Sequence, residues 1–425
     1  MKKRILAFFL ISIFPIASFA SILKITVDAP IHPITSEYIR NTINKAEKEN
    51  ASLVIIVFNT PGGLDSSMRE IIQRILSSKT PVVSFVSPSG ARAASAGFFI
   101  SIACDIFVMA PGTNTGVAHP VAVSLTGQSM DKTMEEKATN DAAAYIITLA
   151  EKRGRNTKLA EDAVRKSRAY TENEALKGNL IDLIAKNEQE IIEYFDGKHI
   201  KRFDGEEELL ELKDEKITDI PMSARQKFLI TISNPNLAYI LLMLGLLGLY
   251  FEFSNPGAIL PGVLGGIFLL LAIFSFQILP INYVGLILIL LAIGLFILEI
   301  KIQSYGVLTA GGLTAMVIGS IMLIDAPIPE LRPSLKFIIP VTLGLSLIFI
   351  FLIVIAIRAH MNKVHTGKEG LVGEIGEVRS KLDPEGKVFV HGELWDAEAT
   401  EKIPKGTKVK VTEVMKNLKI KVTKP

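Results

Sequence analysis

The sequence predicts an α/β domain, a helical transmembrane block and a C-terminal all-β barrel, in that order. Short apolar runs alternate with amphipathic stretches in the first half of the chain. Residues 237–357 hold only seven charged side chains, and the last part consists of β-rich runs separated by glycines. We expect a signal peptide at 1–20, the α/β domain at 21–222, the membrane block at 223–358 and the barrel at 359–425.

Composition limits what the protein can do. The chain has 425 residues, a mean hydropathy of +0.38 and a net charge of +3, which argues against nucleic acid or another polyanion as a partner. Cys104 is the only cysteine, so an intrachain disulfide, a cysteine-based zinc site and a thiol redox pair are excluded. We expect chemistry that uses oxygen and nitrogen groups, with no metal and no cofactor.

The N-terminus has the pattern of a secretory signal. Lys2, Lys3 and Arg4 precede an apolar run at 5–16, and the small residues Ser18 and Ala20 suit signal peptidase. We expect export of the α/β domain and a mature chain that begins at Ser21. The alternative is a retained signal anchor, for which the apolar run is short.

Within the α/β domain, three short apolar runs at 53–58, 82–86 and 106–109 suit buried parallel strands. Apolar stripes predict helices around 39–46 and 68–76, the second with Asp65 in its first turn, and a longer helix covers 132–153. Ligands of such domains bind at the carboxyl ends of the strands. The loops at those ends are therefore the places to search for a site.

The loop at 59–64 contains Gly62 and Gly63, whose bare backbone N–H groups at the start of a helix form an anion-binding corner. The loop at 87–97 places Ser95 among very small residues, in an approximate small-x-Ser-x-Gly turn from Ala93 to Gly97. Such a turn exposes a nucleophilic hydroxyl, and the N–H of Ala96 together with that of Gly63 or Gly62 would stabilise an oxyanion. The alternative is a small-residue turn that serves packing only.

A serine nucleophile needs a base, and two residues downstream are candidates. Lys137 lies on the expected long helix, where burial would lower its pKa; otherwise it is a surface lysine paired with Asp141 four residues on. His119 precedes Pro120 and is the commoner type of general base, or else a histidine that only shapes a turn. The apolar loop from Val117 to Met130 would either close over an apolar peptide or pack in the core.

Five apolar stretches follow, each able to cross a bilayer: 236–253, 259–279, 283–300, 305–324 and 337–357. An odd number of spans after export returns the C-terminus to the cytoplasm, and basic residues from Arg358 to Lys368 agree with this. Four spans are the alternative. We expect the glycines here to permit close helix packing, and Glu252 and Glu299 to be interfacial. Residues 223–232 should lie along the membrane surface.

The regions flanking the membrane block carry less chemistry. We expect a hairpin at 198–203, a solvated acidic face at 204–211 and a five-stranded barrel at 370–424. OB folds that bind oligonucleotides need aromatic stacking platforms, and this segment offers only Phe389 and Trp395. We interpret Trp395 as a core plug and the barrel as a protein-contact module.

Four motifs in order resemble the long-form NfeD family, membrane-bound serine proteases of the ClpP class, and the resemblance covers the whole chain: 60–63, 89–97, 113–120 and 137–141. It implies a ClpP/crotonase-like domain, membrane spans and an OB-like C-terminal barrel. It also implies a Ser-Lys dyad of Ser95 and Lys137, oxyanion donors at Gly63 and Ala96, and a structural or substrate-loop role for His119.

The resemblance further implies the setting of the protein. It points to a multi-pass protein of the cell (inner) membrane, with the protease domain outside the cytoplasm and the barrel inside. The implied substrates are apolar peptide segments, including those of stomatin-like partners, and the implied assembly is a homo-oligomer. Two competing functions are a non-catalytic scaffold for stomatin-like proteins and a crotonase-type acyl-CoA enzyme, and export argues against the second.

Overall fold

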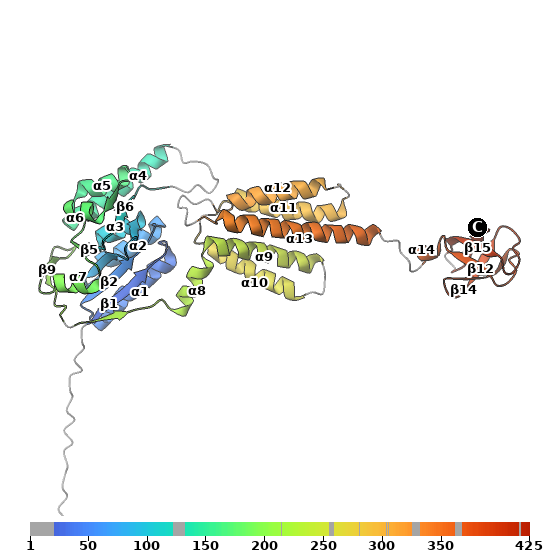
Figure 1. Cartoon of the computed structure of the whole chain (residues 1–425), viewed down its shortest axis with the longest axis horizontal. Helices are drawn as coiled ribbons and strands as arrows, with labels where there is room; N and C mark the ends of the chain where they lie inside the picture. The colour runs from blue at the N-terminus through green and yellow to red at the C-terminus, as the bar shows by residue number, and fades with distance from the viewer. Residues whose placement is uncertain are drawn as a thin grey trace, which may run out of the picture. The chain divides into compact units, whose positions relative to one another are not determined.

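The computed structural model describes residues 21–425, with gaps at 122–131, 214, 255–258, 280, 303, 305, 325–331, 362–367 and 416–417. The chain forms two compact units, one of residues up to 293 with 311–345, the other of 294–310 with 346–425. Figure 1 shows the elements in chain order. The expected signal peptide and most of the expected apolar loop at 117–130 lie outside the described residues.

The first domain is built on a six-stranded parallel sheet with the order β11-β1-β2-β3-β5-β8. Its strands are β1 Ser21–Val27, β2 Leu53–Phe58, β3 Val82–Val86, β5 Ile106–Met109, β8 Leu183–Ile184 and β11 Lys216–Asp219. The three predicted strands, β2, β3 and β5, form at the predicted residues because both of their faces are apolar. The strands β1, β8 and β11 were not predicted.

Helices cover one face of this sheet and a mixed layer covers the other (Figure 1). Val54, Ile56 and Phe58 of β2 face the first layer. This layer comprises α1 Pro33–Glu49, α2 Asp65–Leu76, α3 Ala96–Ala103, α4 Lys132–Lys152 and α5 Thr157–Arg165. Leu53 and Ile55 face the second layer, made by α7 Glu188–Phe195 and the hairpin after it. The alternation of side chains along each strand thus gives both layers a core.

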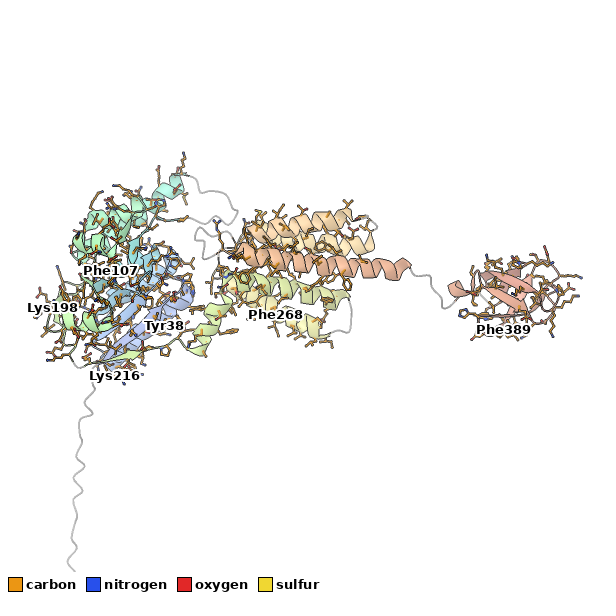
Figure 2. The ribbon with its side chains drawn as sticks, in the orientation of Figure 1. Tyr38, Phe107, Lys198, Lys216, Phe268 and Phe389 are labelled. Carbon is orange, nitrogen blue, oxygen red and sulfur yellow. The ribbon has the colours of Figure 1, made fainter. Side chains whose placement is uncertain are left out.

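Smaller elements complete the domain. Strands β4 Arg92–Ala94, β6 Asn114–Gly116 and β7 Ala169–Thr171 form a three-stranded sheet, and α6 covers Glu172–Lys177. The predicted hairpin is confirmed as β9 His199–Lys201 paired with β10 Glu207–Leu209. The acidic run therefore supplies a strand, and Glu208 contacts the largely buried Arg202 side chain at 3.4 Å. Tyr38 of α1, labelled in Figure 2, donates to the carbonyl of Ile220 just after β11.

A short helix and five apolar helices follow: α8 Ala224–Ile232, α9 Pro235–Ser254, α10 Ile259–Phe276, α11 Tyr283–Lys301, α12 Val307–Met322 and α13 Leu335–Met361. Among the described residues, two segments are long and apolar enough to span a bilayer, Pro235–Phe253 and Ile259–Phe276, and three more apolar helices are shorter. The α9–α10 pair packs through glycines as expected, since a Cβ on Gly248 would lie 2.8 Å from the Cα of Gly265.

Glu299, near the end of α11, has a specific structural role, and its expected place at the membrane interface stays a prediction. Its side chain is buried and accepts hydrogen bonds from the backbone N–H groups of Gly306 and Thr309, at 2.9 Å each, and from the hydroxyl of Ser304 at 2.7 Å. The first N–H groups of a helix have no partner within the helix. Glu299 therefore caps the start of α12, and this demand for acceptors explains why a carboxylate is buried there.

The C-terminal domain is the predicted barrel, closed in the order β12-β13-β14-β16-β15, with α14 at Lys368–Leu371 before it. The strands are β12 Ile375–Val378, β13 Glu385–Val390, β14 Glu393–Ala399, β15 Lys408–Val414 and β16 Ile420–Thr423. Trp395 does not plug the core. It is half-buried at the edge of the core, and its indole N–H is buried without an acceptor among the described residues. Phe389, labelled in Figure 2, is exposed.

Candidate active site

Ser95 lies on a sharp turn between β4 and α3, at the carboxyl edge of the sheet. Its backbone has φ 52° and ψ −119°, a conformation that is costly for a residue with a Cβ. Residues held in this way cluster at active sites, and a strained strand-to-helix turn is the geometry that exposes a nucleophilic serine. The half-buried hydroxyl makes no hydrogen bond within the part of the chain that the structure describes.

Backbone hydrogen bonds from two other loops hold this turn. Thr60 donates its N–H to the carbonyl of Arg92 at 2.7 Å and accepts from the N–H of Ala94 at 3.1 Å. Ser95 in turn donates its N–H to the carbonyl of Gly116 at 3.0 Å. The loops after β2, β3 and β5 are therefore joined at one point. Because buried backbone groups must be paired, these bonds fix the strained residue in place.

Gly62 packs directly against the side chain of Ser95. A Cβ built on Gly62 would lie 2.5 Å from the Cβ of Ser95 and 3.0 Å from its Oγ, and the φ of Gly62 is +112°. Gly97 is tight as well, because a Cβ there would meet the Thr60 side chain at 2.5 Å. Only glycine fits at these two positions. The predicted glycine corner and the predicted serine turn thus form one site, which we call the Gly62–Ser95 corner (residues 60–63 and 93–97).

The backbone N–H groups around the corner are of two kinds. Gly62 donates its N–H to the hydroxyl of Thr60 at 3.2 Å, and is therefore occupied. The N–H groups of Gly63 and Ala96 donate to no acceptor among the residues described. Ala96 begins α3, whose positive dipole end adds to the field at this point. The sequence left either Gly62 or Gly63 as the second oxyanion donor, and the geometry favours Gly63 because its N–H is free.

Lys137 is exposed on the second turn of α4, which contradicts the expected burial. Within the described residues its ammonium group makes no ion pair or hydrogen bond, and the expected surface pair with Asp141 is wrong too. Asp141 instead forms an ion pair with Arg69 of α2, 72 residues away in sequence. The pairing of Asp141 with Arg69 depends on the packing of α4 against α2, and residue spacing within α4 cannot predict it.

Contacts of Arg69 and Tyr145 attach α4 to the corner. The Arg69 guanidinium also bonds Asp65 at 2.9 Å, two residues after Gly63, and lies 4.6 Å from the centre of the Tyr145 ring. Tyr145 stacks on Phe99 of α3 with ring centres 6.1 Å apart. Since residues four apart share one face of a helix, Lys137 projects from the face of α4 that carries Asp141. That face is turned toward the start of α2.

His119 lies three residues after Gly116, and both of its ring nitrogens face acceptors. Its Nδ1 is 3.0 Å from the carbonyl oxygen of Val164, and its Nε2 is 3.7 Å from a carboxylate oxygen of Glu135 on α4. A carbonyl only accepts, so Nδ1 carries the proton and donates it. His119 therefore connects the segment after β6 to the first turn of α4, and its Nε2 is directed to Glu135.

Several residues that build the site were not identified from the sequence. The carbonyl of Gly116 fixes Ser95, Thr60 joins both loops, and Arg69 anchors α4. Thr60 and Gly116 lie in the motifs at 60–63 and 113–120, but the sequence does not show their contacts with the serine turn. Arg69 lies in no motif and acts through contacts between distant parts of the chain.

Comparisons with known proteins cover nearly all of the chain. Residues 21–220 match the N-terminal domain of NfeD1b, 236–355 the NfeD integral membrane domain, and 368–424 the NfeD-like C-terminal, partner-binding domain. A membrane-bound protease of Pyrococcus horikoshii is 35% identical over 97% of this chain and 96% of its own length. The membrane protein NfeD1b of Bacillus subtilis is 26% identical over the same shares. A solved structure of a membrane protease specific for a stomatin homologue, also from Pyrococcus horikoshii, is 31% identical over 50% of this chain and 98% of its own, with a TM-score of 0.44.

Proposed function

The chain belongs to the long-form NfeD family and is a membrane-bound protease, and on this premise we propose that Ser95 is its nucleophile and Lys137 the general base. The observation that carries the proposal is the Gly62–Ser95 corner. A strained serine whose side chain touches a glycine, beside two unpaired backbone N–H groups, is costly to build and has no packing use.

The proposed reaction combines the groups of the corner with Lys137 of α4. The hydroxyl of Ser95 attacks the scissile carbonyl while the neutral amine of Lys137 takes its proton. The N–H groups of Gly63 and Ala96 bind the oxyanion that forms. Collapse of this intermediate releases the amine half of the peptide, which receives the proton from Lys137. Water then hydrolyses the acyl-serine ester and restores the hydroxyl.

The exposure of Lys137 adds a requirement to this mechanism. Removal from water favours the neutral amine that a base requires, and the Lys137 side chain is exposed in this structure. We infer that a bound peptide or a second copy of the chain in a homo-oligomer covers Lys137 and removes water from it. His119 is less suited as the base because its Nε2 is directed to Glu135 and not to the corner. We assign it a role in shaping the substrate loop.

We propose apolar peptide segments as substrates, with stomatin-like membrane proteins among them. Exposed apolar side chains after β6 and in the first turn of α4 support this, since Val117, Val121 and Met134 are 45%, 60% and 50% exposed. A binding surface for apolar peptides has to leave such side chains uncovered. The C-terminal barrel matches a partner-binding domain and is proposed to hold the partner.

The proposed location is the cell (inner) membrane, with five spans that separate an exported protease domain from a cytoplasmic barrel. The signal pattern at 1–20 and the basic residues after the last apolar stretch support this orientation. Reporter fusions after Ile184 and after Gly376 test it. The first should be active only outside the cytoplasm and the second only inside, whereas activity of both on one side would rule out an odd number of spans after a cleaved signal.

Labelling of the full chain with a serine-directed fluorophosphonate tests the nucleophile. Mass spectrometry should find the label on Ser95, and Ser95→Ala should abolish both labelling and peptide cleavage. Ser89→Ala is a matched control, because this serine lies in the same loop and only bonds the carbonyl of Pro111. A wild-type chain that neither labels nor cleaves, yet still binds its partner, would instead be the scaffold.

A further inference from the structure

A cavity of about 210 Å³ lies where the protease domain meets the first membrane helices. One wall comes from the segment at 28–32 and from Leu64, which follows the glycine corner. The other wall comes from the end of α8, the start of α9 and the residues just after α10. We call it the junction pocket. Its main apolar lining residues are Ile31, Leu64, Ile230, Pro235, Ile278 and Leu279.

Specific contacts hold the two walls together. Arg225 of α8 forms an ion pair with Glu37 of α1 at 2.8 Å. The hydroxyl of Ser275 near the end of α10 donates to the carbonyl of Ile232, the last residue of α8, at 2.6 Å. Helix α8 therefore bonds to α1 of the protease domain on one side and to α10 on the other. The junction pocket is a built feature of this unit of the chain.

The junction pocket adjoins the candidate catalytic centre. Ile31 donates its N–H to the carbonyl of Gly62 at 2.8 Å, and Leu64 donates its N–H to the carbonyl of Ile31 at 2.8 Å. Gly62 on its other side touches Ser95. The backbone at 62–63 thus lies between the pocket and the serine. A peptide that places a carbonyl at the N–H of Gly63 passes the side of the corner on which Leu64 begins the pocket wall.

The size and lining of the pocket define what it holds. Ligand sites for drug-sized molecules usually exceed about 300 Å³, while a cavity of about 150 Å³ lined by apolar side chains takes a benzene ring. The junction pocket falls between these sizes, which suits one large apolar side chain. The buried His32 adds no charge, because its Nδ1 accepts the N–H of Ile34 and burial lowers its pKa to about 4. The other polar lining residues have partners outside the pocket: the exposed Asp28 accepts from the Asn59 amide, Ser233 donates to the carbonyl of Leu229, and Asn234 accepts from the N–H of Asn236.

We propose that the junction pocket binds an apolar side chain of the peptide being cleaved, so that the membrane block supplies part of the specificity of the protease. This inference rests on the proposed function of Ser95. The place of the pocket favours this occupant, since Pro235 begins one apolar helix and the end of another lies beside it. Under this proposal, a substrate segment that leaves the bilayer meets the pocket before it reaches the corner.

Filling the pocket tests the proposal. In the full chain in detergent, Ile278→Phe and Ile230→Phe place a larger side chain into the cavity from half-buried positions. Cleavage is measured on pairs of synthetic peptides, each pair differing only by Leu or Ala at a single position, with the position varied along the peptide. At the position whose side chain enters the pocket, the Leu/Ala ratio of kcat/KM should be about tenfold lower in both variants than in the wild-type chain. Ile273→Phe on the exposed face of α10 is the matched control and should leave the ratio unchanged. Unchanged ratios in both pocket variants would overturn the proposal.

A second measurement separates this inference from the proposed function. A synthetic peptide with consecutive leucines between lysine ends, one leucine replaced by a diazirine analogue, is crosslinked to the full-length Ser95→Ala chain. Crosslinks to Ile230, Ile278 or Leu279 support the pocket even if the wild-type chain cleaves nothing, in which case the proposed function alone fails. Crosslinks confined to residues that do not line the pocket overturn the pocket while the protease assignment stands.

Discussion

The Gly62–Ser95 corner and the first turns of α4 carry the two halves of the proposed dyad, and they are built in opposite ways. At the corner, backbone hydrogen bonds from three loops fix a strained serine, and glycines are fitted against their neighbours without spare room. On α4, Lys137 is exposed, and side-chain contacts at Glu135, Asp141 and Tyr145 attach the helix.

The difference shows which part of the site can adjust. A backbone network buried in the domain resists displacement, whereas exposed ion pairs each contribute only about 0–1 kcal/mol. The proposed nucleophile and oxyanion donors are therefore preorganised. Under the same proposal, Lys137 becomes active as the base only when a substrate or a second copy of the chain covers α4 and excludes water.

The largest effect is expected from the base itself. Lys137→Ala should lower kcat on the order of a thousandfold, because an unassisted serine is a poor nucleophile near neutral pH. Lys137→Arg should be as inactive, since arginine keeps the charge but does not release its proton. His119→Ala should cost about tenfold at most, through the loop that it shapes. Rates of peptide cleavage by the purified full chain measure all three.

The pH profile must agree with these variants. The neutral amine is the proposed active form, so kcat/KM should rise with pH and then level off. A folded Lys137→Ala chain with the wild-type rate, alongside an inactive His119→Ala chain, would make histidine the base.

At the corner, Gly62→Ala should lower kcat on the order of a hundredfold, because its Cβ would press on the Ser95 side chain and displace the hydroxyl. Gly90→Ala is the matched control. Gly90 also has a positive φ, +87°, but its surroundings are open, so this variant carries the backbone strain without the contact. Equal losses in the two variants would mean that backbone strain alone is responsible.

For α4, Arg69→Ala should lower kcat by about tenfold, since it removes the ion pair that positions the face carrying Lys137. Arg74→Ala is the control. Arg74 lies on α2, as Arg69 does, but pairs with Glu47 of α1 and not with α4, so this variant should leave the rate unchanged. Hydrogen exchange of the amides of α4 should increase only in the first variant. A normal rate in Arg69→Ala would show that α4 is positioned by its other contacts.

The last prediction concerns stability near the corner and not the rate of cleavage. Burial lowers the pKa of His32 from 6.5 to about 4, so the folded chain binds this proton less readily than the unfolded chain. The contribution of neutral His32 to the free energy of unfolding is complete above about pH 6.5 and is lost as the pH falls toward 4. At pH 5 the loss is about 2 kcal/mol. Thermal unfolding at about pH 7.5 and about pH 5 measures it. His32→Asn, which keeps a capping side chain for α1, should show a smaller loss between these pH values. An equal loss would assign the acid sensitivity to other groups.

Much of the architecture followed from the sequence because its signals are local. Strands β2, β3 and β5 have apolar residues on both faces, which only a covered parallel sheet satisfies, and the barrel has glycines between short β-rich runs. The paired glycines and the small residues around Ser95 also indicated a site, because tight turns need such residues whatever lies around them. The sequence alone therefore determined the domain order, the glycine corner and the candidate serine.

The tertiary structure decided how these parts meet. That Gly62 touches Ser95, that the carbonyl of Gly116 holds it, and that Asp141 pairs with Arg69 and leaves Lys137 exposed all depend on residues far apart in the chain. The spacing of Lys137 and Asp141 predicted a pair on one helix face, but a closer partner on α2 displaced it. Helical periodicity specifies a face of α4, and only the packing of that face against another helix specifies its partner.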